Sequence, residues 1–178
     1  RIFLCEEELT SITSSLGLFN KLSDDGTPVL ILAKDIKQEA LATLLANNKI
    51  GRLKCVAVKL PVMSSGVGSE SEWMDCLAAL CGANIISKER GLPLSQAKLE
   101  DLGYASLVSV NRFSTKILES DRDEAKIQEK LDIYKADSNK LLGEQQLLDT
   151  RRRIEFLSSK AAMITVGYST ELELKEKG

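Results

Sequence analysis

The first half of the chain alternates between continuous apolar runs and segments whose apolar residues have helical spacing. Continuous apolar runs are typical of strands buried on both faces, and amphipathic segments predict helices. The predicted strands are residues 2–5, 29–33, 53–59 and 84–87, and the predicted helices are residues 10–22, 35–48 and 69–82. This alternation, with short connections, indicates an α/β fold in which sheet layers are flanked by helices.

The second half of the chain has a different pattern, with two β-rich segments, two longer helices and a final strand. Their predicted positions are residues 107–111 and 115–119, a helix from residue 121, a helix over 144–157 and a strand over 162–166. Ile127, Leu131 and Tyr134 form the apolar stripe of the first of these helices. Because the chain turns at Gly143 between the two helices, we expect a C-terminal antiparallel helical hairpin.

Three of the predicted helices begin at a capping signature, in which a short polar side chain precedes a Glu or Gln by three positions. The signatures are Asp35-x-x-Gln38, Ser69-x-x-Glu72 and Asp121-x-x-Glu124. We therefore expect the first side chain of each signature to accept a hydrogen bond from an N–H group in the first turn.

The predicted helix over 10–22 carries more apolar residues than one contact with a core requires. Ile12, Leu16 and Phe19 form one stripe, and Leu18 and Leu22 form another that lies about 100° around the helix. One stripe faces the core, and the other must be covered by something else.

The predicted helix over 35–48 has a similar surplus, because Leu41 and Leu45 line one side while Ala40 and Leu44 lie next to them. Two interpretations of these surpluses remain open. Both helices are wedged between layers of the same molecule, or they expose a groove for apolar segments of other proteins.

Composition places the chain among water-soluble domains. Its 178 residues are 43% hydrophobic and 28% charged, which suits one domain, with room for a fragment of a second. The 24 Lys and Arg residues against 26 Asp and Glu residues leave a net charge of -2, which argues against nucleic acid as a partner. No apolar run approaches the roughly 20 residues that a membrane span needs, so we expect no membrane partner. The chain begins at Arg1 without Met, which suggests a piece of a longer polypeptide.

The absence of histidine removes the usual general base and the commonest metal ligand. Ser-His-Asp, Cys-His and HExxH chemistries are therefore excluded, and we expect neither catalytic residues nor a metal site. The four cysteines form no C-x-x-C pair and lie among apolar neighbours, so we expect reduced, buried thiols and a reducing compartment.

Three short motifs have a chemical interpretation that their context does not support. Ser95-x-x-Lys98 lacks the companion elements of acylating enzymes, and Gly66-Val-Gly68 lacks the Lys-Ser/Thr of a phosphate loop. Arg151-Arg-Arg153 cannot present three side chains on one helix face, so a solvated surface is the simpler interpretation.

Four separated segments agree, in order and in spacing, with one known family. They are Glu39-Ala-Leu-Ala-Thr-Leu-Leu-Ala-Asn47, Leu53-Lys-Cys-Val-Ala-Val-Lys59, Lys98-Leu-Glu-Asp-Leu-Gly103 and Ile164-Thr-Val-Gly-Tyr-Ser-Thr-Glu-Leu-Glu-Leu-Lys-Glu-Lys177. The chain resembles the apical domain of group I chaperonins, the GroEL type, over nearly its whole length. The resemblance implies an apical (substrate-binding) domain over residues 1–161, with residues 162–178 as the start of the intermediate domain or a tail.

In that family, two neighbouring helices of the apical domain bind non-native polypeptides and the mobile loop of a GroES-type co-chaperonin. The resemblance implies that the corresponding binding residues here are Ile12, Leu16, Phe19, Asn20, Ser23, Glu39, Leu41, Thr43, Leu45, Ala46, Asn47 and Ile50. They include the surplus apolar stripes. The implied function is folding assistance by an ATP-dependent ring of chaperonin subunits.

The chain departs from the family at three places and therefore resembles a divergent paralogue. The family's Pro-Gly-Phe-Gly-Asp-Arg-Arg segment is replaced by residues 61–72, which lack the arginines. Ile50 stands where an Arg is usual, and Ser159-Lys160 replaces the Gly-Gly hinge. These departures suit an alternative in which the chain is a specialised subunit or adaptor with few partners.

The resemblance also implies that this fragment is no enzyme, because ATP and Mg would bind an equatorial domain that has no counterpart here. A remote alternative is a small-molecule enzyme whose site lies at the Gly66 loop. The family and the reduced cysteines imply the cytoplasm of a bacterium, with a plastid stroma or a mitochondrial matrix as the alternative.

Overall fold

In the computed structural model, the described residues are 1–60, 69–111, 114–140 and 143–165, and they form a mixed α/β fold. The strands are β1 (Ile2–Leu9), β2 (Val29–Ile36), β3 (Cys55–Lys59), β4 (Ala105–Val110), β5 (Ser114–Ser120) and β6 (Ala161–Thr165). The helices are α1 (Leu16–Asp25), α2 (Gln38–Lys49), α3 (Ser69–Cys81), α4 (Glu124–Ser138) and α5 (Glu144–Ser158), with short 3₁₀ helices η1 (Thr13–Ser15), η2 (Leu94–Gln96) and η3 (Leu99–Asp101). No helix in this part of the chain is long and apolar enough to cross a membrane.

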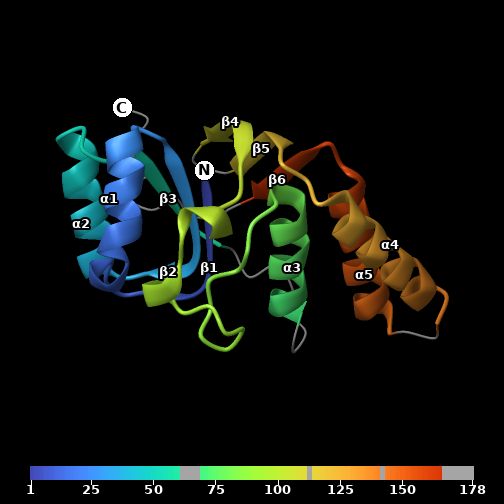
Figure 1. Cartoon of the computed structure of the whole chain (residues 1–178). Helices are drawn as coiled ribbons and strands as arrows, with labels where there is room; N and C mark the ends of the chain where they lie inside the picture. Colours follow the sequence, from blue (N-terminus) through green and yellow to red (C-terminus); the bar gives the residue numbers. More distant parts are fainter. Residues whose placement is uncertain (61–68, 112–113, 141–142, 166–178) are drawn as a thin grey trace.

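Strands β1, β2 and β3 form a parallel sheet in that order, with Ile2 beside Leu30 and Leu30 beside Val56. Alternate residues of each strand enter two different cores. Leu30 and Leu32 contribute to the core shared with α3, α4 and α5, whereas Ile31 contributes to the core shared with α1 and α2. Helices therefore cover both faces of the sheet (Figure 1), and this confirms the prediction of strands buried on both faces.

Strands β4, β5 and β6 form a second, antiparallel sheet. The chain between the two sheets returns to β1, where Ile86 forms an isolated bridge with Cys5 in place of the predicted strand over 84–87. Gly103 forms another bridge with Ile2, and a Cβ atom at Gly103 would lie 2.6 Å from the carbonyl oxygen of Cys81. Only glycine fits this close approach of backbone to backbone.

The start of α1 differs from the prediction. Strand β1 extends to Leu9, a 3₁₀ turn follows, and α1 begins only at Leu16. Ile12 therefore precedes the helix and does not share a helical stripe with Leu16 and Phe19. Periodicity could not show this, because a 3₁₀ turn before a helix has nearly the same spacing of side chains.

Two of the predicted helix caps are wrong. Asp35 belongs to β2 and pairs with Lys37 at 2.8 Å and with Lys59 at 3.4 Å, so α2 begins without a side-chain cap. The cap of α4 is Asp123, which accepts from the backbone N–H of Lys126 at 3.1 Å. The predicted cap at Ser69 involves a side chain outside the described part of the structure, and the Gly66 loop also lies outside the described residues.

Helices α4 and α5 pack along each other beside α3 (Figure 1). Ile127, Leu131 and Tyr134 are buried, as their stripe predicted. The guanidinium of Arg122 donates to the carbonyl oxygens of Leu157 at 2.9 Å and Ser159 at 2.6 Å. The start of α4 is thereby joined to the end of α5, whose last carbonyls have no partner within the helix.

Candidate functional site

Helix α1 places its largest side chains against the sheet. Leu18, Phe19 and Leu22 are at most 5% exposed and belong to the core below α1, whereas Leu16 is 46% exposed. Ile12 is also buried, at 4%. The expectation that Ile12 and Phe19 belong to an apolar binding surface is therefore wrong, because both side chains are part of the core below α1. Of the three residues predicted to share one stripe, Leu16 is the one that faces solvent.

Helix α2 divides its two rows of apolar residues between the core and the edge of the core. Ala40 and Leu44 are fully buried against the sheet, and the neighbouring Leu41 and Leu45 are half-buried at the edge of the same core. Ile50, the first residue after α2, is 71% exposed. The helix therefore leaves three large aliphatic side chains partly or fully open to solvent.

Helices α1 and α2 cover the same face of the parallel sheet (Figure 1). The hydroxyl of Ser23 on α1 donates to the carbonyl oxygen of Arg52, which follows α2. We define the α1–α2 surface as the predicted binding residues that are exposed or half-buried, namely Leu16, Asn20, Ser23, Glu39, Leu41, Thr43, Leu45, Ala46, Asn47 and Ile50.

Most polar groups of the α1–α2 surface bond to the protein itself. The hydroxyl of Thr43 donates to the carbonyl oxygen of Glu39 at 2.9 Å, and the side-chain amide of Asn47 donates to the carbonyl oxygen of Thr43 at 2.8 Å. The carbonyl oxygen of Asn47 accepts from the backbone N–H groups of Arg52 and Leu53. A ligand would therefore gain most of its contact from the aliphatic side chains and from the exposed side chains of Asn20 and Glu39.

Sequence reasoning missed the contribution of Arg52 to this surface. Its carbonyl oxygen holds the Ser23 hydroxyl and so joins the end of α1 to the chain after α2. No side-chain pattern could reveal this role, because any residue type supplies a backbone carbonyl. Gly51, with a φ of 72°, is the visible signal of the turn that brings Arg52 there.

None of the four cysteines forms a disulfide, and all four are buried. Burial raises the pKa of the Cys5 thiol to about 11 and that of the Cys81 thiol to about 12. Burial also raises the pKa of Cys76, whose Sγ lies 3.5 Å from the hydroxyl of Tyr134. The thiols of Cys5, Cys76 and Cys81 are therefore protonated near neutral pH, so they are poor nucleophiles and poor metal ligands. In the described part of the chain, no group of three Cys, Asp or Glu residues could hold a metal ion.

No protein-family model matches the chain. A solved structure, the chaperonin gp146 from the bacteriophage EL 2 (Pseudomonas aeruginosa) in presence of ATP-BeFx, is similar with a TM-score of 0.56 and 17% sequence identity. The match covers 99% of this chain and 35% of the length of gp146. The chain thus has a chaperonin-like fold, and it spans about a third of that chaperonin.

Proposed function

We propose that this chain is the apical part of a chaperonin subunit and that its α1–α2 surface binds exposed apolar segments of unfolded proteins. One observation carries the proposal. On a chaperonin-like fold, two helices cover one face of a sheet, and Leu16 on α1, Leu41 and Leu45 on α2 and Ile50 just after α2 are exposed or half-buried. Large aliphatic side chains that remain exposed on neighbouring elements are typical of surfaces that bind apolar partners.

The energetics favour weak, reversible binding at one such surface. If the remaining exposed areas of the four aliphatic side chains each contribute about 1 to 1.5 kcal/mol, the gross gain is about 4 to 6 kcal/mol. The loss of freedom on association consumes most of this gain. Several copies in a ring would raise the affinity through effective concentration, and a rigid rotation that hides the surface would release the client.

The remaining parts of the proposal concern a longer parent chain. The parent subunit would form a ring, bind ATP and Mg in an equatorial domain, and meet a GroES-type co-chaperonin at the same α1–α2 surface. The fragment itself would catalyse no reaction, and the parent protein would work in a reducing compartment such as the bacterial cytoplasm. Residues 1–161 would be the apical domain, and residues 162–178 would lead into the intermediate domain.

A direct test titrates a fluorescent amphipathic Leu-rich peptide against the chain and against the double variant Leu41→Asp with Leu45→Asp. We expect the double variant to bind at least about tenfold more weakly, because two carboxylates would have to be desolvated at the contact. The matched control is Ala136→Asp, which adds a carboxylate at an exposed position of α4, a helix that packs with the core on the other face of the sheet. Equal binding by the double variant and the wild type would refute the assignment of the surface.

A narrower partner range is favoured by one observation, the 71% exposed Ile50 where the family usually has an Arg. An aliphatic residue there removes a donor for polar contacts and makes the end of the surface more apolar. A specialised subunit or adaptor would bind its own partner and leave unfolded model proteins unbound. Suppression of aggregation of several unrelated denatured proteins would instead support general capture.

A further inference from the structure

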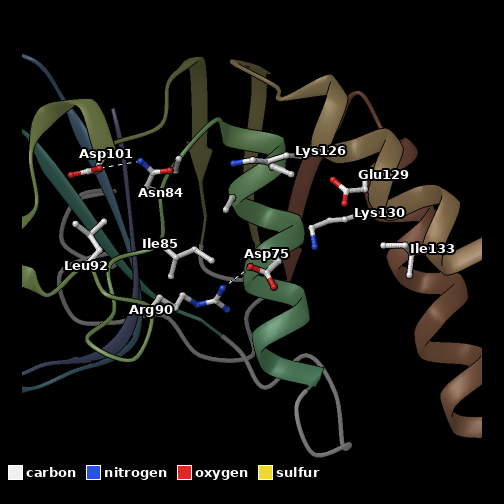
Figure 2. Close-up of a pocket in the computed structure, with 13 residues that line it drawn as sticks. Asp75, Asn84, Ile85, Arg90, Leu92, Asp101, Lys126, Glu129, Lys130 and Ile133 are labelled. Carbon is white, nitrogen blue, oxygen red and sulfur yellow. Dashed lines mark hydrogen bonds and ion pairs between the residues drawn. The ribbon is translucent and has the colours of Figure 1, made fainter.

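Helix α3 lies between the parallel sheet and the α4–α5 hairpin (Figure 1). On the sheet side, Leu77 of α3 and Leu30 of β2 belong to one apolar core. Arg90 adds a polar tie, since its guanidinium donates to Asp75 of α3 at 2.7 Å and to Glu6 of β1 at 2.6 Å. A dashed line in Figure 2 marks the contact of Arg90 with Asp75. Helix α3 is therefore held to the sheet by apolar and polar contacts together.

The other side of α3 meets the hairpin through buried polar groups. We define the α3–hairpin interface by residues that contact one another there, namely Glu72, Trp73, Cys76, Tyr134, Arg153 and Phe156. Arg153 is 8% exposed, and its Nη1 lies 2.5 Å from Oε2 of Glu72. The same guanidinium lies over the ring of Tyr134, whose hydroxyl is 3.5 Å from Sγ of Cys76. Among the described residues, Glu72 and Arg153 form the one ion pair between α3 and the hairpin.

This interface encloses polar atoms that the protein does not satisfy. In the described part of the chain, Nε of Arg153 and Nε1 of Trp73 are buried without a hydrogen-bond partner. The same holds for Oδ1 of Asp149, which lies about one turn before Arg153 on the buried face of α5. Unpaired buried polar atoms weaken the contact that encloses them, because water would satisfy them if the contact opened. The α3–hairpin interface is therefore weaker for its area than the apolar contact between α3 and the sheet.

The contact between α3 and α4 is also incomplete. A cleft of about 630 Å³ opens between them and the segment over 83–92, with Ala78 of α3 on one wall and Lys130 and Ile133 of α4 on another (Figure 2). Ile133 is 51% exposed. Side chains that line an open cleft make no contact across it, so less apolar area has to be exposed when the two helices separate.

The hairpin is attached to the rest of the molecule at one end. Strand β5 leads into α4 and α5 leads into β6, so both connections lie beside the antiparallel sheet (Figure 1). At this end the backbone N–H of Asp123 donates to the carbonyl oxygen of Ala79 on α3 at 2.9 Å. The bonds from Arg122 to Leu157 and Ser159 join the two helices to each other at the same end. The attachment therefore suits a rotation of both helices together.

We propose that the α4–α5 hairpin separates from α3 as one unit while the parallel sheet stays folded, and that the Glu72–Arg153 ion pair holds the closed state. The hairpin rotates about the end at Asp123. Opening exposes buried side chains such as Leu131 and Tyr134, so the open state is the minor one at equilibrium. The motion thus controls whether the apolar stripe of α4 is accessible. It does not involve the α1–α2 surface, which lies on the other face of the sheet.

The test measures how fast iodoacetamide reacts with each cysteine of the chain under native conditions, followed by mass spectrometry of peptides. Cys76 lies in the α3–hairpin interface, whereas Cys5 and Cys55 belong to strands of the parallel sheet, and all three are buried. A buried thiol reacts only while the structure around it is open. We expect Cys76 to react at least about tenfold faster than Cys5 and Cys55, and its rate to rise less steeply with urea, because a partial opening exposes less surface than global unfolding.

Two variants of the ion pair should act in opposite directions. Glu72→Ala leaves the buried guanidinium of Arg153 without its carboxylate, so we expect Cys76 to react at least about tenfold faster than in the wild type. Arg153→Met removes the buried charge and the unpaired Nε, and it leaves Glu72, whose side chain is 49% exposed, in water. Cys76 should then react about threefold more slowly. The matched control is Glu155→Ala, which removes a carboxylate at an exposed position of α5 and should leave the rate unchanged.

Circular dichroism verifies that each variant remains folded. The proposal is overturned if Cys76 reacts at the same rate as Cys5 and Cys55 with the same urea dependence, because the hairpin then opens only when the whole chain unfolds. It is also overturned if Glu72→Ala behaves as Glu155→Ala does, or if Arg153→Met reacts faster than the wild type. Hydrogen exchange should give the central amides of α4 and α5 the same urea dependence, and different values would show that the helices do not move as one unit.

Discussion

The ring of Phe19 on α1 packs against the ring of Phe3 on β1, with centroids 5.7 Å apart and planes inclined by 34°. This contact places Phe19 in the core and leaves Leu16 as the exposed large aliphatic side chain of α1. The core contact of α1 and the proposed ligand contact therefore involve different residues of one helix.

Phe19→Ala should lower the free energy of unfolding by about 3 to 4 kcal/mol, because it removes a buried ring and leaves a cavity. Leu16→Ala should change it by less than about 1 kcal/mol and weaken binding of the Leu-rich peptide by about threefold. Urea denaturation measures the first effect and anisotropy the second. Phe19→Leu is the control, since it keeps a large apolar side chain in the core and should preserve binding of the Leu-rich peptide. Strong loss of peptide binding in folded Phe19→Leu, with none in Leu16→Ala, would contradict this division.

Ile50→Arg should weaken binding of the Leu-rich peptide by about fivefold and leave the free energy of unfolding within about 0.5 kcal/mol of the wild type. The reason is that Ile50 is 71% exposed and its side chain contributes to the surface and little to the core. Ile50→Leu should bind as the wild type does. If Ile50→Arg and Ile50→Leu bound equally, Ile50 would lie outside the contact.

Arg90 should make stability depend on pH. Its guanidinium, which donates to the Glu6 carboxylate, holds the pKa of Glu6 below the ordinary 4.5. A carboxyl whose pKa is lower in the folded state stabilises the fold above its unfolded pKa, and this contribution is lost as the pH falls through the folded pKa. The loss should therefore begin at about pH 4.5 and continue below it.

Arg90→Met should lower the free energy of unfolding at pH 7 by about 1 to 2 kcal/mol, and the difference from the wild type should shrink below about pH 4. Urea titrations from neutral to acidic pH measure both effects. Lys88→Met, which removes an exposed charge from the same segment, is the control and should parallel the wild type. A constant difference at all pH values would show that Arg90 acts only through packing.

Arg122→Ala should loosen the end of α5. The variant removes the donors to the carbonyl oxygens of Leu157 and Ser159, so we expect about 1 to 2 kcal/mol less stability and faster amide exchange in the last turn of α5. Hydrogen exchange followed by mass spectrometry measures the local effect. Arg151→Ala, which removes an exposed side chain of α5, should leave the exchange rates unchanged.

The sequence by itself determined the order and type of most elements. Apolar runs such as Val29–Ala33 predicted strands covered on both faces, and α3 and α5 begin and end within one residue of the predicted positions. These features follow from local periodicity, because a strand in a layered fold needs apolar side chains on both sides and a helix needs them on one.

Only the tertiary structure decided which apolar side chains remain exposed. Periodicity placed Leu16 and Phe19 on one stripe, yet the first is 46% exposed and the second 4%. The difference arises because Phe3, distant in sequence, meets Phe19 across the core, and because the 3₁₀ turn sets where α1 begins. The cleft beside α4 likewise depends on residues from three separate elements, which no local pattern could bring together.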